Sequence, residues 1–178
     1  MRLGRALWCS LLGLVLALPA QAQGAGHDTG HDTGKLLTHV AWLTEHKGYK
    51  NTPLPPALLQ ALGWTTERHT RWVVYQAPYD DEKYFHVFYS CRVPGTSNRQ
   101  LVLVSSRKGT GRMHVFWSDP AGRLLGAAGG LKVGAAETDW NWAPISVESD
   151  DIRARFAAEL DYWRIKQHDL EKLPERKP

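Results

Sequence analysis

The apolar residues between positions 36 and 43 have helical spacing. Five of them fall on one side of a 3.6-residue helix: Leu36, Leu37, Val40, Ala41 and Leu43. Asp32 or Thr33 precedes the run as a candidate N-cap, and Gly48 follows it as a stop. We therefore predict a helix from about residue 34 to residue 47.

A second, shorter helix is predicted within the segment 51–64. Pro55 or Pro56 suits the first turn of a helix, where a missing backbone N–H costs nothing. Gly63 suits the position just after the last turn, because glycine readily adopts a left-handed conformation.

Between residues 71 and 147 the pattern changes to short β-branched and aromatic runs separated by turn residues. Four strands are predicted, at 71–76, 84–93, 100–106 and 112–118, joined as an antiparallel meander. The Gly- and Ala-rich segment 124–140 weakly favours either a strand or a wide loop. A possible fifth strand follows at 141–147.

The last apolar pattern is again helical. Ile152, Phe156, Leu160 and Trp163 form one stripe, and Ser149 or Asp150 caps its start. We expect this amphipathic helix to lie across one face of the sheet. The predicted fold class is therefore α+β, with a meander of four to five strands, two short N-terminal helices and a C-terminal covering helix.

The N-terminus has the features of a secretory signal peptide. Arg2 and Arg5 precede an apolar run at 6–18, and the small-residue pattern of Ala20 and Ala22 follows. The run is shorter than the roughly 20 residues that span a membrane. We predict cleavage after Ala22, export to the periplasm or secretion, and no permanent membrane anchor.

The remaining chain suits one domain. We predict a flexible polar leader at 23–33, a single α+β domain at 34–173 and a frayed charged tail at 174–178. Without Arg2 and Arg5 the chain has 20 Lys and Arg against 18 Asp and Glu, so its formal charge falls from +4 to +2. This near-balance, with no basic cluster, argues against nucleic-acid binding.

A tandem GHDT unit raises the question of a metal site. His27, Asp28, His31 and Asp32 supply the ligand types that zinc accepts. Three glycines in and after the repeat oppose a rigid arrangement, and ordering a flexible loop around an ion is costly. The preferred interpretation is a polar leader, with metal binding as the alternative, and we predict neither a metal nor a cofactor.

Cys91 is the one cysteine of the mature region, so no intramolecular disulfide forms there. It falls late in a predicted strand, where His86 points to the opposite face. His114 lies on a neighbouring strand, and the Ser-x-x-Lys match at Ser105 lies in a strand and turn. Burial of the thiol is therefore favoured over nucleophilic catalysis.

Six residues in or beside the loops of the sheet are the predicted partner-binding positions: Asp80, Asp81, Arg112, Asp119, Trp140 and Trp142. The two tryptophans are two apart, so an extended backbone turns both rings to one face, where they either fill a core or anchor a partner. The acidic turn at 80–82 has oxygens for calcium but no EF-hand spacing, and a solvated hairpin tip is the simpler interpretation.

No established catalytic motif is present, which favours a role other than catalysis. The leading hypothesis is an exported protein-interaction module, such as an inhibitor or immunity-type protein that blocks an envelope-acting enzyme through its sheet loops. One alternative is a small-ligand or cell-wall glycan binding protein that uses exposed aromatics. A second alternative is a small hydrolase built on Cys91.

Overall fold

The computed structural model describes residues 29–50, 54–65 and 72–176. This part of the chain contains three helices: α1 (Thr29–Lys47), α2 (Pro56–Leu62) and α4 (Asp150–Lys172). The strands are β1 (Tyr49–Lys50), β2 (Val73–Asp80), β3 (Tyr84–Arg92), β4 (Arg99–Arg107), β5 (Arg112–Ser118), β6 (Leu124–Lys132) and β7 (Trp140–Ile145). The α+β class predicted from the sequence is confirmed.

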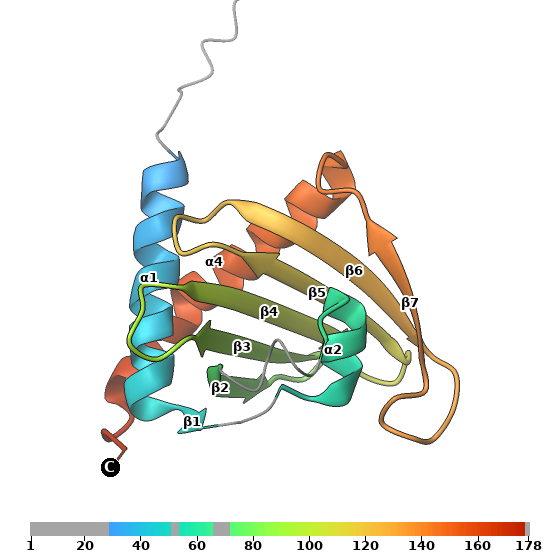
Figure 1. Cartoon of the computed structure of the whole chain (residues 1–178), viewed down its shortest axis with the longest axis horizontal. Coiled ribbons are helices and arrows are strands. Elements are labelled where there is room, and N and C mark those ends of the chain that lie inside the picture. Colours follow the sequence, from blue (N-terminus) through green and yellow to red (C-terminus); the bar gives the residue numbers. More distant parts are fainter. Residues whose placement is uncertain (1–28, 51–53, 66–71, 177–178) are drawn as a thin grey trace, which may run out of the picture.

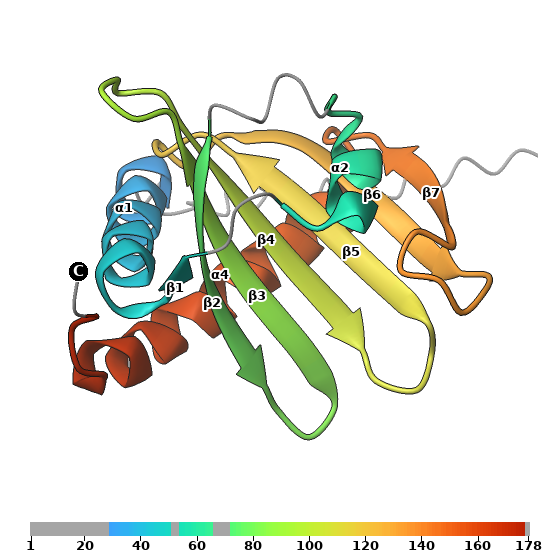
Figure 2. The same cartoon turned by 60° about the horizontal axis from the view of Figure 1, so that its bottom comes forward.

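The strands form a single antiparallel sheet in which spatial order equals chain order (Figure 1). In such a meander the connections alternate between the two ends of the sheet. The β2–β3, β4–β5 and β6–β7 connections therefore lie at one end, which we call the hairpin end (Figure 2). Strands β3 and β5 run in the same direction, on either side of β4.

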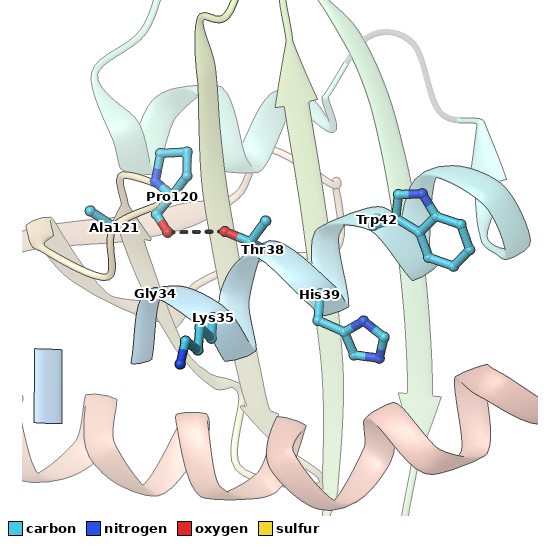
Figure 3. A pocket seen from close by; sticks show the side chains of 7 residues that line it. All are labelled: Gly34, Lys35, Thr38, His39, Trp42, Pro120 and Ala121. Carbon is cyan, nitrogen blue, oxygen red and sulfur yellow. Dashed lines mark hydrogen bonds between the residues drawn. The ribbon is translucent and has the colours of Figure 1, made fainter. Parts of the chain in front are cut away.

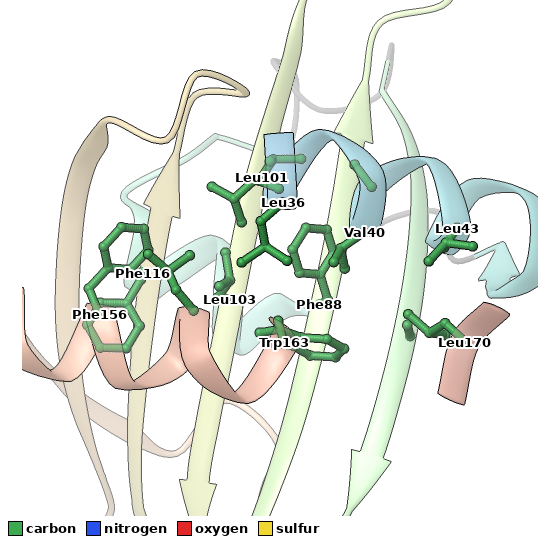
Figure 4. Close-up of a cluster of buried hydrophobic side chains, with 14 of the residues drawn as sticks. Leu36, Val40, Leu43, Phe88, Leu101, Leu103, Phe116, Phe156, Trp163 and Leu170 are labelled. Atoms are coloured by element: carbon green, nitrogen blue, oxygen red, sulfur yellow. The ribbon is translucent and has the colours of Figure 1, made fainter. Parts of the chain in front are cut away.

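One face of the sheet is covered by α1 and by α4, which crosses the strands obliquely (Figures 1 and 2). The predicted stripe of α4 is confirmed, since Ile152, Phe156, Leu160 and Trp163 are all buried. They pack with α1 and with Phe88 of β3 in the larger apolar core (Figure 4). Burial of so many aliphatic and aromatic side chains, each contributing about 1.5–3 kcal/mol, holds both helices on the sheet.

The short helix α2 covers the opposite face and closes a second apolar core. Pro56 occupies the first turn as predicted, and Gly63 ends the helix with φ of 62°. Cys91 lies fully buried in this core. Desolvation raises the pKa of its thiol far above the usual value, which keeps the sulfur protonated and opposes a nucleophilic role.

The predicted count of four to five strands is wrong, because the sheet has seven. The Gly- and Ala-rich segment left open as strand or loop contains β6. Its glycines make room for large rings on the neighbouring strands: a Cβ at Gly126 would stand 2.0 Å from Trp117, and one at Gly130 would stand 2.5 Å from Trp142. Side-chain packing between strands thus overrides the low strand propensity of glycine.

The other additional strand is β1, whose two residues are too few to give a periodic pattern. Strand β2 is also longer than predicted and continues through Pro78 to Asp80. Proline is tolerated there because β1 pairs only with Tyr75 and Gln76, so no strand on that side needs a donor from Pro78.

Two short N-terminal helices are also not what the structure contains. Helix α1 has 19 residues and begins at Thr29, inside the stretch predicted as a flexible leader. Asp32 lies in its first turn, where a carboxylate interacts favourably with the helix dipole. The predicted signal peptide lies outside the described residues. None of the helices in the described ranges is long and apolar enough to cross a membrane.

Candidate functional site

A hollow of about 900 Å³ lies between α4 and the hairpin end of the sheet. It forms on the face that carries the larger core, on the side of α4 that faces the hairpin end. Its floor comes from β3 to β7, and its wall from the residues of α4 between Arg155 and Tyr162.

The floor is built from two rows of side chains set by the strand register. In the inner row, Ser105 lies directly opposite His86 on β3 and His114 on β5. Gly129 comes next on β6, and its missing side chain leaves space beside His114. The row therefore places two imidazoles on either side of one hydroxyl.

The outer row lies one step nearer the hairpin tips. There Arg107 of β4 pairs directly with Arg112 of β5, between Tyr84 and Leu131. Both arginines are exposed, and within the described part of the chain neither guanidinium forms an ion pair. Like charges directly opposite each other destabilise a sheet, so the repulsion between these two arginines lowers the stability of the folded state.

The sequence contains a signal for the inner row that the strand analysis missed. The five-residue pattern His-Val-Phe-aromatic-Ser occurs twice, at 86–90 and at 114–118. Because β3 and β5 flank β4 in the same direction, the repeat places equivalent residues at equivalent heights. The histidines border the hollow while the phenylalanines enter the core.

Glu159 of α4 holds the imidazole of His86 in place through its carboxylate. This carboxylate is almost fully buried, and Nδ1 of His86 lies 3.0 Å from Oε1 and 3.1 Å from Oε2. The indole N–H of Trp163 donates to the same Oε1 at 3.0 Å. Nε2 of His86 faces Oδ2 of Asp81 at 3.7 Å, so a carboxylate stands near each ring nitrogen.

Asp81 is held in place by the tight β2–β3 turn. Its Oδ1 accepts the backbone N–H groups of Tyr84, at 2.6 Å, and Lys83, at 2.9 Å. These hydrogen bonds, that from Tyr84 foremost, lower the pKa of the carboxyl group. The side chain therefore remains ionised at the mouth of the hollow.

His114 has a different environment. Partial burial and the nearby guanidinium of Arg155 lower the pKa of its imidazole below the usual 6.5, and Arg112 acts in the same direction. The ring is therefore mostly neutral at pH 7. Asp151 and Glu159 act in the opposite direction, but burial and the two arginines outweigh them.

Tyr162 supplies an unused polar atom. Its ring stacks on His86 with centroids 3.7 Å apart. Its hydroxyl oxygen is buried, yet it has no hydrogen-bond partner among the described residues. Buried hydroxyls normally have a partner, so this group suits a bound ligand or water.

The structure separates the six predicted partner-binding residues into three places. Asp81 and Arg112 both line the hollow, and Asp80, which pairs with Lys108, lies beside them at the hairpin end. Trp140 and Trp142 stack on each other with centroids 5.3 Å apart, on the opposite face of the sheet. Asp119 lies at the other end of the sheet, where it pairs with Arg123 at 3.2 Å.

The structure describes only part of the tandem GHDT unit. His27 and Asp28 lie outside the described residues, and Asp32 is exposed on α1. Among the described residues no group of three or more His, Cys, Asp or Glu is arranged to hold a metal ion. The alternative of a metal site at the repeat therefore stays a prediction.

A second hollow, of about 820 Å³, lies beside α1 at the end of the sheet opposite the hairpin end (Figure 3). Thr38 donates a hydrogen bond to the carbonyl oxygen of Pro120 across it, at 3.4 Å. Trp42 is exposed there and His39 already pairs with Glu171. This hollow is shallower, and fewer charged side chains converge on it than on the first.

Comparisons of this chain with protein-family models, with curated proteins and with solved structures find no significant match. The two hollows and the hairpin end are therefore the features of the molecule that indicate a function.

Proposed function

We propose that this protein binds a small anionic ligand in the hollow between α4 and the sheet. The observation that carries the proposal is the cross-strand pair of Arg107 and Arg112 at its mouth, two exposed cations without an acidic partner among the described residues. A bound carboxylate or phosphate would neutralise a repulsion that the free protein contains, and arginine recognises both groups with two parallel hydrogen bonds.

The rest of the hollow suggests an apolar body attached to the anionic group. Tyr84, Phe116 and Leu131 provide ring and aliphatic surface, while Ser105 and Tyr162, whose buried hydroxyl has no partner among the described residues, are polar residues of the lining. Apolar walls with a few convergent polar groups are typical of small-ligand sites. This version of the small-ligand hypothesis places recognition in arginines and tyrosines rather than in the tryptophan pair.

Calorimetric titration with benzoate, phenylphosphonate and benzamide tests the proposal. Benzamide has the shape of benzoate without its charge, so we expect the two anions to bind and benzamide not to bind. Arg107→Gln should weaken both anions, whereas Arg164→Gln, a matched change at an exposed arginine of α4 that pairs with Asp161, should not. An anion site would be contradicted if benzoate and benzamide bound equally well. It would also be contradicted if an uncharged glycan bound and the two anions did not.

Export to the periplasm, or secretion, remains part of this proposal. It is supported by the order of basic, apolar and small residues before Ala22. N-terminal sequencing of the protein recovered from a periplasmic fraction should begin at Gln23.

A protein partner is the second candidate function, and the exposed apolar residues of the hairpin end favour it. Phe85 and Leu131 are 39% and 47% exposed, and Val133, at the start of the β6–β7 connection, is 65% exposed. Asp80 and Arg112 add charges of both signs beside them. Exposed aromatic and aliphatic side chains next to arginine are common at protein interfaces. This surface fits the inhibitor or immunity-type hypothesis.

Capture experiments with two charge substitutions separate this candidate from the first. Val133→Asp should abolish recovery of a stoichiometric envelope protein by the immobilised chain. Ile165→Asp, an equally exposed position on α4, should leave recovery unchanged. If both variants capture the same proteins as the unaltered chain, the hairpin end is not the interface.

A further inference from the structure

We propose that the hollow is also a catalytic site, in which His114 and His86 act as general base and general acid in the hydrolysis of a phosphodiester. This inference rests on the proposed anion binding, because the arginines would hold the same phosphate. It goes beyond it by assigning chemistry to the histidine row. The absence of a linear motif does not oppose it, since acid–base sites are defined by geometry rather than by spacing in the sequence.

The placement of the two imidazoles is the first support. Both lie directly opposite Ser105, one on each neighbouring strand, and both line the hollow. Neighbouring strands are about 4.8 Å apart, so β3 and β5 are separated by about 10 Å. A phosphorus atom above Ser105 would therefore have one imidazole on each side. Attack and departure on opposite sides of phosphorus are what an in-line displacement requires.

The different surroundings of the histidines assign their roles. His114 lies among Arg112, Arg155 and partly buried surface, which keeps its ring neutral and able to accept a proton. His86 lies between the carboxylates of Glu159 and Asp81, an arrangement that suits a proton donor. The carboxylates beside one imidazole and the guanidinium groups beside the other give the two histidines different roles in the proposed step.

The anionic substrate class follows from the arginines. A phosphodiester carries a negative charge before reaction and gains more on its equatorial oxygens in the transition state. Arg107 and Arg112 at the mouth, with Arg155 on α4, are placed to stabilise that charge. A neutral carboxylic ester would leave Arg107 and Arg112 without an acidic partner among the described residues, whereas Arg155 already pairs with Asp151 at 2.8 Å.

The reaction balances with water as the only co-reactant. His114 accepts a proton from water while the water oxygen bonds to phosphorus. The bond from phosphorus to the leaving oxygen breaks, and that oxygen takes a proton from His86. The products are a phosphomonoester and an alcohol, and one proton returns from His114 to His86 through solvent to complete the cycle.

The pH dependence is set by all the groups that face His114. From α4 these are Arg155 and, more weakly, Asp151 and Glu159, while Arg112 lies on its own strand. Ser105 and Gly129 are its neutral neighbours on the adjacent strands. Burial of the imidazole, the largest cause, and the two arginines together outweigh the two carboxylates, so the acidic limb of the rate profile should have its midpoint below pH 6.5.

The test measures the release of phenol, a leaving group basic enough to need a proton, from diphenyl phosphate by the processed full-length protein, in the presence of EDTA. We expect turnover above the buffer rate, and a rate that falls at acidic pH as His114 becomes protonated. His114→Gln should lower kcat by about 100-fold or more and remove the acidic limb. His168→Gln, a matched change at a histidine that is 65% exposed near the other end of α4, should leave turnover unchanged.

His86→Gln gives the second arm and should also lower the turnover of diphenyl phosphate, because it removes the proposed proton donor. Because His86 is buried, its variant is used only if it unfolds cooperatively, and His114→Gln decides the question by itself otherwise. Phenylphosphonate binding without turnover would overturn catalysis and leave the proposed ligand site standing. Failure of phenylphosphonate to bind would overturn the ligand site itself. Turnover that is equal in the unaltered chain and in His114→Gln would also overturn the inference.

Discussion

The opposed arginines allow a prediction in which stability and binding change in opposite directions. In Arg112→Gln the cross-strand repulsion with Arg107 is removed, so the free energy of unfolding should rise. The same change removes a charged donor from the mouth of the hollow, so anion affinity should fall. If Arg112 contributed only to the stability of the fold, Arg112→Gln would instead lower the free energy of unfolding.

The magnitudes follow from the register and the exposure of the pair. Directly opposite side chains on antiparallel strands interact by about 0.2–1 kcal/mol. Both arginines are exposed, so screening reduces the effect, and we expect a gain of about 0.5 kcal/mol at low ionic strength. A hydrogen bond to a charged group contributes about 1.5–3 kcal/mol. The affinity for phenylphosphonate should therefore fall by about 10- to 150-fold.

Urea unfolding at two salt concentrations and calorimetric titration measure the two effects. The stability gain should shrink at high salt, because the screening length falls to about 3 Å at 1 M. Arg123→Gln is the matched control, since that arginine is 76% exposed and already pairs with Asp119. It should not gain stability or lose affinity. A destabilised Arg112→Gln with unchanged affinity would refute the assignment of Arg112 to a ligand site.

Three further predictions test the fold and the histidine row. Glu159→Ala should cost about 3–5 kcal/mol in urea unfolding, because it leaves His86 and the indole N–H of Trp163 buried without their acceptor, and a loss under about 1 kcal/mol would contradict this. Gly126→Ala should cost about 1–3 kcal/mol, because its Cβ would stand 2.0 Å from Trp117; Gly129→Ala on the same strand meets only the tip of Ile145 at 3.2 Å and should cost clearly less. Because the pKa of His114 is lowered in the folded state, the unfolded chain binds more protons than the folded chain just below pH 6.5. The contribution of this residue to stability is therefore present above pH 6.5 and is lost as the pH falls through the pKa of the folded state. NMR titration of the imidazole should place its pKa below 6.5, and His114→Gln should flatten the pH dependence of stability there.

The spacing of apolar residues predicts the elements that bury one regular apolar face. The stripe of Ile152, Phe156, Leu160 and Trp163 defines α4, and both the pattern and the cap position were sufficient to place it. Strand β5 was predicted with the bounds that the structure has. The Gly- and Ala-rich β6 could not be predicted with certainty, because its stability comes from rings on β5 and β7 that pack over its glycines.

The site was less accessible to sequence reasoning than the fold. Asp81 and Arg112 were selected as loop residues and do line the hollow. His86 and His114 were considered only in relation to Cys91, which lies on the other face. Their placement side by side depends on the register with Ser105, and that of His86 also on Glu159, which is 73 residues away in the chain. The repeated His-Val-Phe pattern was the one local signal of this arrangement.

The most direct test of the ligand site is a site-resolved titration. Phenylphosphonate is added to the isotope-labelled processed protein while the backbone amide signals are followed by NMR. We predict saturable shifts centred on Ser105, His114 and Gly129, with none at Trp42 beside the second hollow, and their loss in Arg112→Gln. Shifts confined to another surface, or a linear response without saturation, would contradict the account.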